Sequence, residues 1–270
     1  MSAPTAETLT ESLRPLTDDP SQAAVFCDID GTLAPIVNRP EDARVPEEAS
    51  VTLSKLGRSY GCVACVSGRA AAEARRLVGV GSIAYVGSHG AELLEPGSSQ
   101  PQLLDAFVSW EGRVSQFVEN QAEDGELKRL RIRTEDKGPI KAFHWRDTPD
   151  EAASERWLQN VAQEAEAASL EIHWGRKVLE IRPPVPVDKG QAITSMVRSS
   201  GVRKALYGGD DVTDLDAFDA LQALVADGDL DAAVCIGVRS EEGPRAIVER
   251  ADVAVDGVQG FRDVLAALLR

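Results

Sequence analysis

Two aspartates, two positions apart, directly follow a short apolar segment near the start of the chain. The segment is 23–27 (Ala-Ala-Val-Phe-Cys), and Asp28, Asp30 and Gly31 come after it. Five apolar residues in a row are typical of a strand that is buried on both faces. Side chains at i and i+2 of an extended segment point to the same side. We therefore expect both carboxylates at the carboxyl end of a strand, where open α/β sheets bind ligands, with Gly31 permitting a sharp turn.

These two carboxylates suit a phosphoryl-transfer reaction. A buried aspartate can act as a nucleophile that splits a difficult transfer into two easier steps, and Asp28 is the candidate. Asp30 is the candidate acid that protonates the leaving oxygen and the base that then deprotonates water, which requires its side chain to stay off a metal. Clustered carboxylates also repel each other unless a cation lies between them, and Mg²⁺ prefers such oxygen ligands.

A second acidic group lies near the other end of the chain, after the apolar segment 204–207 and two glycines. It consists of Asp210, Asp211 and Asp214. We expect Asp210 to complete a magnesium site with Asp28, and the other two to tune that site or to orient a lysine. The alternative is a turn followed by a helix cap, since short polar residues suit a first helical turn.

Ser67 and Lys189 are the candidates for phosphate binding. Ser67 follows the apolar segment 62–66 and precedes an Ala-rich segment, 70–78, that is expected to be helical. Its hydroxyl and the helix N-terminal amides can hold a phosphoryl oxygen, although an ordinary N-cap is the alternative. Lys189 stands at the start of another expected helix and would supply positive charge, with a solvated surface lysine as its alternative.

The charge balance limits the classes of partner. The chain has 270 residues, 43% of them hydrophobic, with 29 basic against 44 acidic residues and a formal net charge of −15. This argues against a nucleic-acid partner, which needs a basic face. An anionic substrate then needs a local cation or a metal. No apolar run approaches the roughly 20 residues of a membrane span, and the first 20 residues lack the basic start of a signal peptide, so they are expected to form a helix or a loose arm.

Cysteine usage indicates a reducing compartment. Cys62 and Cys65 have the spacing of a redox motif, but they lie within the expected strand 62–66. Residues three apart on a strand point to opposite faces, so we expect small buried thiols rather than a disulfide. We therefore expect a cytoplasmic protein.

Strand-like and helix-like segments alternate in two separate parts of the chain. In the first part, strands at 23–27, 62–66 and 83–86 alternate with helices beginning at 46 and 70. After residue 186 come a helix from 188, a strand at 204–207, a helix to 224, a strand at 233–238, an edge strand near 253 and a C-terminal helix. This alternation predicts an α/β fold with a parallel sheet.

The middle of the chain has a different pattern. Segments 95–102 and 182–186 have the composition of linkers. Between them we expect a helix from about 104, alternating stretches at 127–134 and 139–145 around a hairpin turn at 135–138, a helix at 149–168, and strands at 170–174 and 178–182. This predicts an α+β insert, 101–184, within a core of 1–100 and 185–270, with the two linkers acting as a hinge.

The order of the chemical groups is similar to that of the haloacid dehalogenase superfamily of phosphotransferases. Asp-x-Asp-Gly-Thr comes first, then a serine, a lysine and Gly-Asp-Asp. The resemblance implies a Rossmann-like parallel-sheet core that uses Mg²⁺. Asp28 would be the nucleophile, Asp30 the acid/base, Ser67 and Lys189 the phosphate ligands, and Asp210 a metal ligand. An insert between the serine and the lysine implies the sugar-phosphatase type of cap.

A narrower set of motifs resembles the trehalose-6-phosphate phosphatase family, from about residue 24 to the C-terminus. These motifs are 67–69 (Ser-Gly-Arg), 87–90 (Gly-Ser-His-Gly), 135–138 (Glu-Asp-Lys-Gly), 144–146 (His-Trp-Arg), 175–183 (Gly-Arg-Lys-Val-Leu-Glu-Ile-Arg-Pro) and 209–214 (Gly-Asp-Asp-Val-Thr-Asp). The chain departs from that pattern at Trp145, where tyrosine is usual, and at Gly208, where a bulky residue is usual.

The resemblance implies three sets of site residues. They are Ser67, Gly68, Arg69 and Lys189 for phosphate; Asp28, Asp30, Asp210, Asp211 and Asp214 for the metal; and His89, Glu135, Lys137, His144, Arg146, Lys177 and Glu180 for substrate. Four of the substrate set, Glu135, Lys137, Lys177 and Glu180, would hydrogen-bond the hydroxyls of the distal glucose, and paired polar groups reject substrates that lack matching hydroxyls. Exposed charges at a strand edge are the alternative.

The expected function is Mg²⁺-dependent hydrolysis of trehalose 6-phosphate to trehalose and phosphate, through an aspartyl-phosphate, as part of carbohydrate metabolism. The partner is then a small sugar phosphate, with no nucleic acid and no membrane, and the chain is expected to be a monomer. Three alternatives stay open: a phosphatase for a related sugar or pseudo-disaccharide phosphate, a sugar phosphomutase, and a non-catalytic regulatory domain of the same fold.

Overall fold

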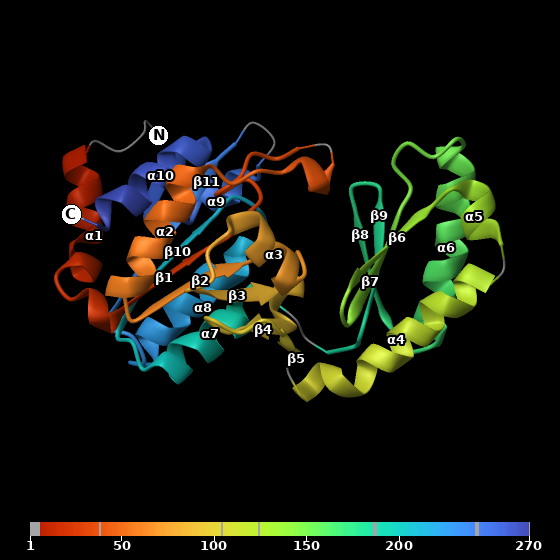
Figure 1. Ribbon diagram of the computed structural model, residues 1–270, viewed down its shortest axis with the longest axis horizontal. Helices are drawn as coiled ribbons and strands as arrows, with labels where there is room; N and C mark the ends of the chain where they lie inside the picture. Colours follow the sequence, from red (N-terminus) through yellow and green to blue (C-terminus); the bar gives the residue numbers. More distant parts are fainter. Residues whose placement is uncertain are drawn as a thin grey trace. The chain divides into compact units, whose positions relative to one another are not determined.

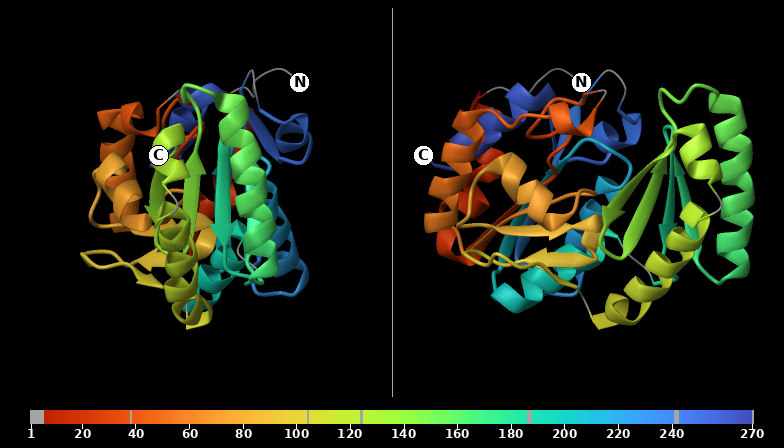
Figure 2. Two further views of the ribbon diagram at one scale, coloured as in Figure 1. Left: turned by 90° about the vertical axis from the view of Figure 1, so that its right-hand side faces the viewer. Right: turned by 45° about the vertical axis from the view of Figure 1, so that its right-hand side comes forward.

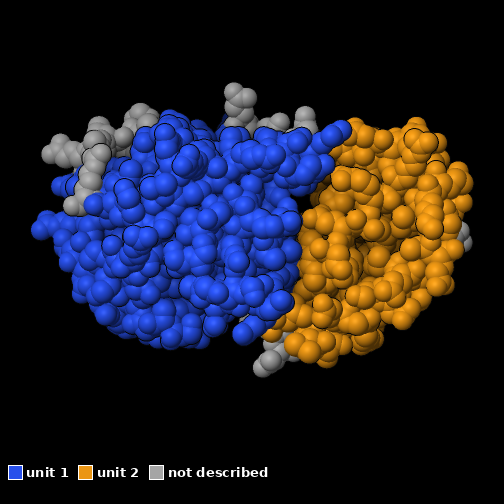
Figure 3. All heavy atoms as spheres, viewed as in Figure 1, with its two compact units in different colours: residues 1–102, 187–270 blue, residues 103–186 orange. Residues whose placement is uncertain are grey.

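The structure, a computed structural model, describes residues 6–37, 39–103, 105–123, 125–185, 188–240 and 243–269. The chain divides into two compact units (Figure 3). Unit 1 consists of residues 1–102 and 187–270, and unit 2 consists of residues 103–186. Unit 1 is thus built from two separate segments of the chain, and unit 2 from one continuous insert.

Unit 1 contains a sheet whose central strands are parallel, which confirms the predicted α/β class (Figure 1). Its strands, in spatial order, are β12 (Val253–Asp256), β11 (Ala232–Arg239), β10 (Lys204–Gly209), β1 (Ala23–Cys27), β2 (Cys62–Val66), β3 (Ala84–Gly87), β4 (Glu92–Leu94) and β5 (Gln102–Leu103). All neighbours from β12 to β3 pair in parallel, whereas β4 pairs antiparallel to β3. Strand β4 has only three residues and is not predicted from the sequence, because so short a strand shows no alternation of apolar and polar residues.

Helices cover both faces of this sheet. One face carries α1 (Ala6–Thr17), α2 (Glu47–Ser59), α3 (Ala71–Val78) and α10 (Gly257–Ala267); the other carries α7 (Lys189–Ser200), α8 (Asp214–Ala226) and α9 (Arg245–Glu249). Three short 3₁₀ turns, 20–22, 40–42 and 88–90, lie between these elements. All five residues of β1 are buried, and they alternate between the two apolar cores. This double burial accounts for the unbroken apolar run before Asp28. Within the N-terminal segment, residues 6–17 are helical, which is one of the two predicted alternatives; residues 1–5 lie outside the described residues.

Gly208 allows helix α10 to approach the sheet. A Cβ atom placed on Gly208 would lie 2.0 Å from Cε2 of Phe261, a side chain of α10 that is fully buried. The phenylalanine ring therefore occupies the space that a bulky side chain at position 208 would need. The departure from the family pattern at this position has a packing explanation.

The cysteines behave as predicted. Cys65 belongs to the apolar core on one face of the sheet, and Cys62 packs against the core on the other face. All four cysteines are free thiols. Cys65 instead approaches Cys27 on the neighbouring strand, with 3.9 Å between the two Sγ atoms.

Unit 2 is an α+β structure with an antiparallel sheet, as predicted for the insert. Its strands, in spatial order, are β6 (Arg133–Lys137), β7 (Ile140–His144), β9 (Val178–Arg182) and β8 (Glu171–Gly175). Its helices are α4 (Asp105–Glu123), α5 (Glu126–Leu130) and α6 (Glu151–Ala167). These helices pack on one face of the sheet around a core that includes Phe143 and Leu179 (Figure 2).

The hairpin predicted around residues 135–138 is present, but the predicted bounds, a strand at 127–134 and a turn at 135–138, are wrong. Residues 126–130 form helix α5, which buries Leu127 and Leu130 at helical spacing. Strand β6 begins only at residue 133 and continues to 137, where Lys137 pairs with Ile140. The turn is therefore at residues 138–139, with Gly138 at a φ of +72°. Short apolar runs fit helix and strand equally well.

Among the described helices, none combines the length and the apolar character needed to cross a membrane.

Candidate active site

Asp28 lies at the carboxyl end of the central strand of unit 1. Its backbone N–H donates to the carbonyl of Gly208 at 2.9 Å, which extends the pairing of β1 with β10 by one residue. Its side chain is almost fully buried, and Oδ1 accepts a hydrogen bond of 2.7 Å from Nζ of Lys189. Within the described part of the chain, nothing donates to Oδ2 of Asp28. One oxygen is therefore fixed and the other is available for chemistry.

Lys189 is placed by the start of helix α7. Asp188 caps this helix by accepting from the backbone N–H of Gln191 at 2.7 Å. The ammonium of Lys189 also donates to Oδ1 of Asp214 at 2.6 Å. Burial lowers the pKa of Lys189, but Asp214 and Asp28 together raise it above its ordinary value. Lys189 is therefore a buried, permanently charged group between two carboxylates.

Asp214 positions its neighbours. This agrees with one of the two roles predicted for it, which is to orient a lysine. Besides Lys189, its Oδ1 accepts from the hydroxyl of Tyr207 at 2.6 Å. Its Oδ2 accepts from the backbone N–H groups of Asp210 and Asp211, both at 2.9 Å. Four hydrogen bonds use the acceptor capacity of this carboxylate, so Asp214 holds the lysine and the 210–211 turn in place.

Asp210 meets the turn that follows Asp28. Its Oδ1 accepts from the hydroxyl of Thr32 at 3.1 Å. A Cβ atom on Gly31 would lie 2.0 Å from Oδ2 of Asp210, and Gly31 has a φ of +92°. Glycine is required here for both its backbone conformation and its lack of a side chain. The two acidic turns are thus interlocked, although they lie in different segments of the chain.

The carboxylates of Asp28, Asp210 and Asp214 form a cluster that fits a divalent cation. One oxygen of each lies within 4.8 Å of the others, and all three residues are buried. Burial, and then the negative charge of Asp214, raise the pKa of Asp210 to about 7. When all three are ionised, Lys189 offsets only one charge, and the remaining excess is what a hard divalent ion would neutralise. Asp30 and Asp211, both predicted for the metal set, are not members of this cluster.

Asp30 is held by Arg69. Nε and Nη2 of Arg69 donate to Oδ2 and Oδ1 of Asp30 at 2.6 and 2.8 Å, a bidentate pair. Nη1 of Arg69 donates to Glu73 at 2.5 Å. Arg69, predicted to bind phosphate, therefore contacts two carboxylates, and it pairs with Asp30, which is not a member of the three-carboxylate cluster. Asp211 is exposed and accepts from the N–H of Val212.

Ser67 lies at the end of β2 but not at a helix N-cap. Helix α3 begins at Ala71 with Ala70 as its N-cap, so the expected cap alternative for Ser67 is wrong. The hydroxyl of Ser67 accepts from the N–H of Arg69 at 3.2 Å. A Cβ atom on Gly68 would lie 2.7 Å from the ring of His89, so the imidazole packs against this turn. Ser67, Gly68, Arg69 and His89 are therefore brought together.

In unit 2, four of the predicted substrate residues share the face of the sheet that does not pack on its helices. Glu135 and Glu180 lie on either side of Ala142 in the strand register. Nζ of Lys137 donates to Oε1 of Glu180 at 2.8 Å, and Nε2 of His144 lies 2.7 Å from Oε2 of Glu135. Burial raises the pKa of Glu135, but the hydrogen bond to His144 and the charge of Lys137 outweigh it and lower the pKa.

Lys177 is not part of this group. Its ammonium donates to Glu151 of helix α6 at 2.8 Å, and its φ of +61° places it in the turn between β8 and β9. No hydrogen bond joins Arg146 to the four residues among the interactions described. Arg182, which the sequence did not single out for the site, donates to Oε2 of Glu180 from Nε and Nη2, at 3.0 and 2.5 Å. Its signal was the i+2 spacing after Glu180 on a strand.

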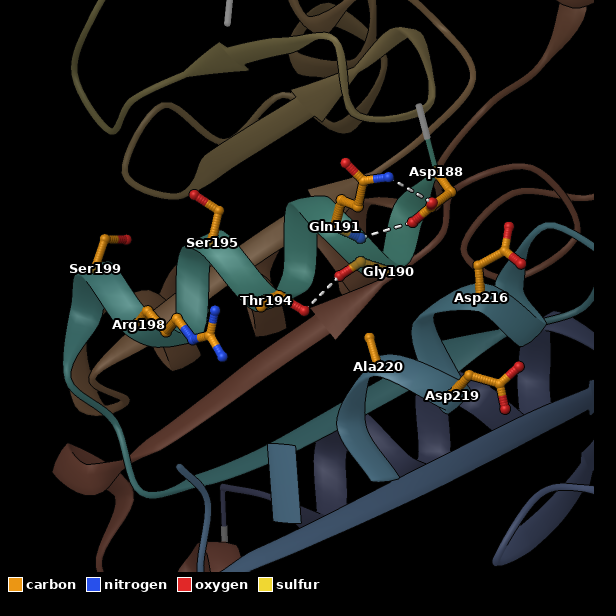
Figure 4. A pocket seen from close by; sticks show the side chains of 10 residues that line it. All are labelled: Asp188, Gly190, Gln191, Thr194, Ser195, Arg198, Ser199, Asp216, Asp219 and Ala220. Carbon is orange, nitrogen blue, oxygen red and sulfur yellow. Dashed lines mark hydrogen bonds between the residues drawn. The ribbon is translucent and has the colours of Figure 1, made fainter. Parts of the chain in front are cut away.

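A groove between α7 and α8 has a volume of about 870 Å³ (Figure 4). It is lined by Asp188, Gly190, Gln191, Thr194, Ser195, Arg198, Ser199, Asp216, Asp219 and Ala220. Neither Asp28 nor Asp210 lines it, so this groove is separate from the carboxylate cluster.

The family model described as trehalose-phosphatase matches residues 26–250. A trehalose-phosphate phosphatase of Mycobacterium avium is 34% identical over 232 residues, which cover 83% of this chain and 56% of that protein. An uncharacterized glycosyl hydrolase of Mycobacterium tuberculosis is 35% identical over 206 residues, 74% of this chain and 15% of that protein. The chain thus spans about half of one relative's length and a small part of the other's.

The fold has counterparts among solved structures. A crystal structure of a trehalose-6-phosphate phosphatase related protein superposes with a TM-score of 0.72 at 24% identity, covering 91% of this chain and 97% of that one. This likeness concerns the fold. The family model, by contrast, spans both acidic turns, Lys189 and the whole of unit 2. The chain therefore belongs to the trehalose-phosphatase family.

Proposed function

We propose that this chain is a Mg²⁺-dependent phosphatase that hydrolyses trehalose 6-phosphate to trehalose and phosphate. The observation that carries the proposal is the buried cluster of Asp28, Asp210 and Asp214 around Lys189. Its members come from both segments of unit 1, and among the residues that the structure describes none donates to Oδ2 of Asp28. Family membership supports the substrate class.

The reaction begins with attack by Asp28. Its unbonded oxygen forms a bond to phosphorus, and the bond between phosphorus and the sugar oxygen breaks. Asp30 gives its proton to the departing sugar oxygen, which leaves as a hydroxyl group. A water molecule then attacks phosphorus and passes its proton to Asp30. The bond between phosphorus and Asp28 breaks, which releases phosphate and restores the carboxylate.

The charges around Asp28 support this sequence. The ammonium of Lys189 holds Oδ1 of Asp28 in one orientation, so that Oδ2 is presented to the substrate. Asp30 must leave Arg69 to reach the sugar oxygen, which frees the guanidinium of Arg69 for an oxygen of the phosphoryl group. When this ion pair opens, Asp30 can take the acid/base role and Arg69 the phosphate-binding role, as predicted for each from the sequence.

Asp28 and Asp210 are the residues that would hold Mg²⁺. Oδ1 of Asp28 accepts only from Lys189 and keeps a second lone pair, and Oδ2 of Asp210 has no donor among the described residues. A bound Mg²⁺ would neutralise charge on the phosphoryl oxygens. We assign Asp214 the positioning role, and neither Asp30 nor Asp211 a side-chain role at the metal.

Recognition of the sugar is assigned to unit 2. Glu135, Lys137, His144 and Glu180 form a chain of paired polar groups on one sheet face. Such groups favour a substrate whose hydroxyls replace the partners they give up. We include Arg182 as the residue that fixes Glu180.

A panel of phosphosugars tests the proposal. Initial rates of phosphate release would be measured for trehalose 6-phosphate, glucose 6-phosphate, sucrose 6-phosphate and a pseudo-disaccharide phosphate, each with Mg²⁺ and with EDTA. Trehalose 6-phosphate should give the highest kcat/KM, and EDTA should remove the activity. If another phosphosugar gave a higher kcat/KM, that sugar would replace trehalose 6-phosphate as the assigned substrate. Dependence on a sugar bisphosphate, with no net phosphate release, would indicate a phosphomutase.

A further inference from the structure

A buried carboxylate outside the catalytic set connects two turns of unit 1. Glu92, in the short strand β4, is 5% exposed. Its Oε1 accepts from the hydroxyl of Ser88 at 2.6 Å, and its Oε2 accepts from the backbone N–H of Ala71, the first residue of helix α3, at 3.3 Å. Glu92 therefore ties the turn that carries His89 to the start of α3.

The turn at 87–90 is in direct contact with the turn at 67–69. The N–H of Ser88 donates to the carbonyl of Arg69 at 2.8 Å, and the N–H of His89 donates to the carbonyl of Ser67 at 3.0 Å. The ring of His89 packs on Gly68. Any movement of the 87–90 turn therefore changes the backbone that carries Ser67 and Arg69.

This turn adopts an unfavourable backbone conformation. Ser88 and His89 have φ values of +50° and +59°, in the left-handed region that side chains other than glycine rarely occupy. Two such residues in succession persist only where the surroundings hold them. The space is also tight, since a Cβ atom on Gly87 would lie 2.2 Å from the backbone nitrogen of Ala71. The hydrogen bond from Ser88 to Glu92 is one interaction that holds the conformation.

We infer that Glu92 is a positioning residue for phosphate binding: through Ser88 and the start of α3 it fixes the 67–69 turn, including Ser67 and Arg69, in the conformation that receives a phosphoryl group. The inference rests on the proposed phosphatase function. Glu92 does not touch substrate in this account. It maintains a preorganised turn, whose displacement by even a fraction of an ångström weakens binding.

The test compares the affinity of folded variants for inorganic phosphate, measured by titration calorimetry in the presence of Mg²⁺, well below each variant's Tm. Glu92→Ala and Ser88→Ala should each weaken phosphate binding by about tenfold and lower kcat/KM for trehalose 6-phosphate in parallel. Glu92→Gln should restore affinity to within about threefold of the original chain, because an amide can accept from Ala71 and donate to the serine hydroxyl.

Ser50→Ala provides the matched control. The hydroxyl of Ser50 donates to the carbonyl of Val78, the last residue of α3, at 2.7 Å. This variant loses a comparable hydrogen bond at the opposite end of the same helix, and it should lower Tm without changing phosphate affinity.

Unchanged phosphate affinity in the Ser88→Ala variant would overturn the inference, and it remains decisive if Glu92→Ala does not fold. An equal loss of affinity in Ser50→Ala would also overturn it, since any weakening of α3 would then suffice. If the unsubstituted chain neither binds phosphate nor releases it from any phosphosugar, the proposed function fails and the inference fails with it.

Discussion

Lys189 donates to two buried carboxylates but offsets only one negative charge, and this imbalance governs the chemistry of the individual residues. Asp28 and Asp214 both accept from it, while Asp210 lies beside them without a cation. Burial raises the pKa of Asp28, Lys189 lowers it, and Asp214 and Asp210 raise it again, with a net upward shift. The nucleophile is thus held in a site where removing one negative charge relieves repulsion.

Replacing Asp28 with asparagine should therefore abolish turnover without unfolding the chain. We expect kcat to fall by at least about 10³-fold, since the nucleophile is lost, and Tm to stay the same or rise. Phosphate release and thermal unfolding by circular dichroism measure both effects. Asp211→Asn is the control, because Asp211 is exposed and outside the cluster. Normal activity in Asp28→Asn would contradict the assignment, as would inactivity in Asp211→Asn.

Asp210 should make the stability of the metal-free protein depend on pH. Its pKa is raised to about 7 in the folded chain, against roughly 3.9 in an unfolded chain. Between these values the folded form keeps a proton that the unfolded form loses, so the free energy of unfolding falls as pH rises through this window. For a chain of this size, a change of about 1 kcal/mol in the free energy of unfolding shifts Tm by about 2–4 °C.

Calorimetry in EDTA should accordingly give a lower Tm at pH 7.5 than at pH 5, and Mg²⁺ should raise Tm more at pH 7.5. Asp210→Asn should reduce both effects. The prediction would be contradicted if, without metal, the Tm of the original chain rose between pH 5 and pH 7.5 while that of Asp210→Asn did not.

Among the individual residues, the sequence predicted the site residues that lie in motifs. It missed the residues whose hydrogen bonds hold those side chains in place. Asp28, Asp210 and Lys189 are brought together as their spacing after strands and at helix starts implied. Tyr207, Thr32 and Glu92 were missed, because a hydrogen bond between distant parts of the chain leaves no periodic pattern. Arg69 was assigned to phosphate, whereas the structure pairs it with Asp30, a choice that depends on side-chain reach.

At the scale of the elements, helix α10 approaches strand β10 through Phe261, at the position where Gly208 has no side chain. Phe261 fills the position that a side chain at 208 would occupy. Gly208→Val should therefore destabilise the fold by about 3 kcal/mol or more, through overpacking and strain. Phe261→Ala should cost about 3–5 kcal/mol by leaving a cavity.

The double variant Gly208→Val/Phe261→Ala should be more stable than the sum of the two losses, by at least about 1 kcal/mol, since the valine then partly fills the cavity. Urea unfolding of the four proteins measures this coupling energy. Strict additivity would mean that the two positions do not compete for the same space.

The sequence predicted the α/β alternation and the antiparallel insert because long buried strands and amphipathic helices have clear periods. It failed at 127–137, where a five-residue helix and a strand follow each other. Leu127, Leu130 and Ile132 are all buried, so the apolar spacing fits either element. The error has a functional consequence: Glu135 and Lys137 lie within a strand, where they share a face, and not in a turn.

At the scale of the whole molecule, the proposed function assigns phosphoryl transfer to unit 1 and sugar recognition to unit 2. Variants of the two units should then differ in which substrates they affect. Lys137→Ala should lower kcat/KM for trehalose 6-phosphate by about 10²-fold or more, but it should change the hydrolysis of p-nitrophenyl phosphate little. Asp28→Asn should abolish both reactions.

Arg129→Ala is the matched control for the first variant, since Arg129 forms an exposed ion pair with Glu126 in helix α5 of unit 2. It should leave both rates unchanged. Equal losses of both activities in Lys137→Ala would contradict the assignment of recognition to unit 2.

The nucleophilic role of Asp28 is tested most directly by identifying the residue that carries the phosphoryl group during turnover. The chain and its Asp30→Asn variant would be mixed with trehalose 6-phosphate and Mg²⁺, quenched in acid within the first turnover, digested and analysed by mass spectrometry. The proposed mechanism predicts phosphorylation of the peptide at Asp28 in the original chain, and both slower formation and slower breakdown of the phosphorylated form in Asp30→Asn, since Asp30 acts in both steps. Release of phosphate with no phosphorylated Asp28 in either protein would contradict it.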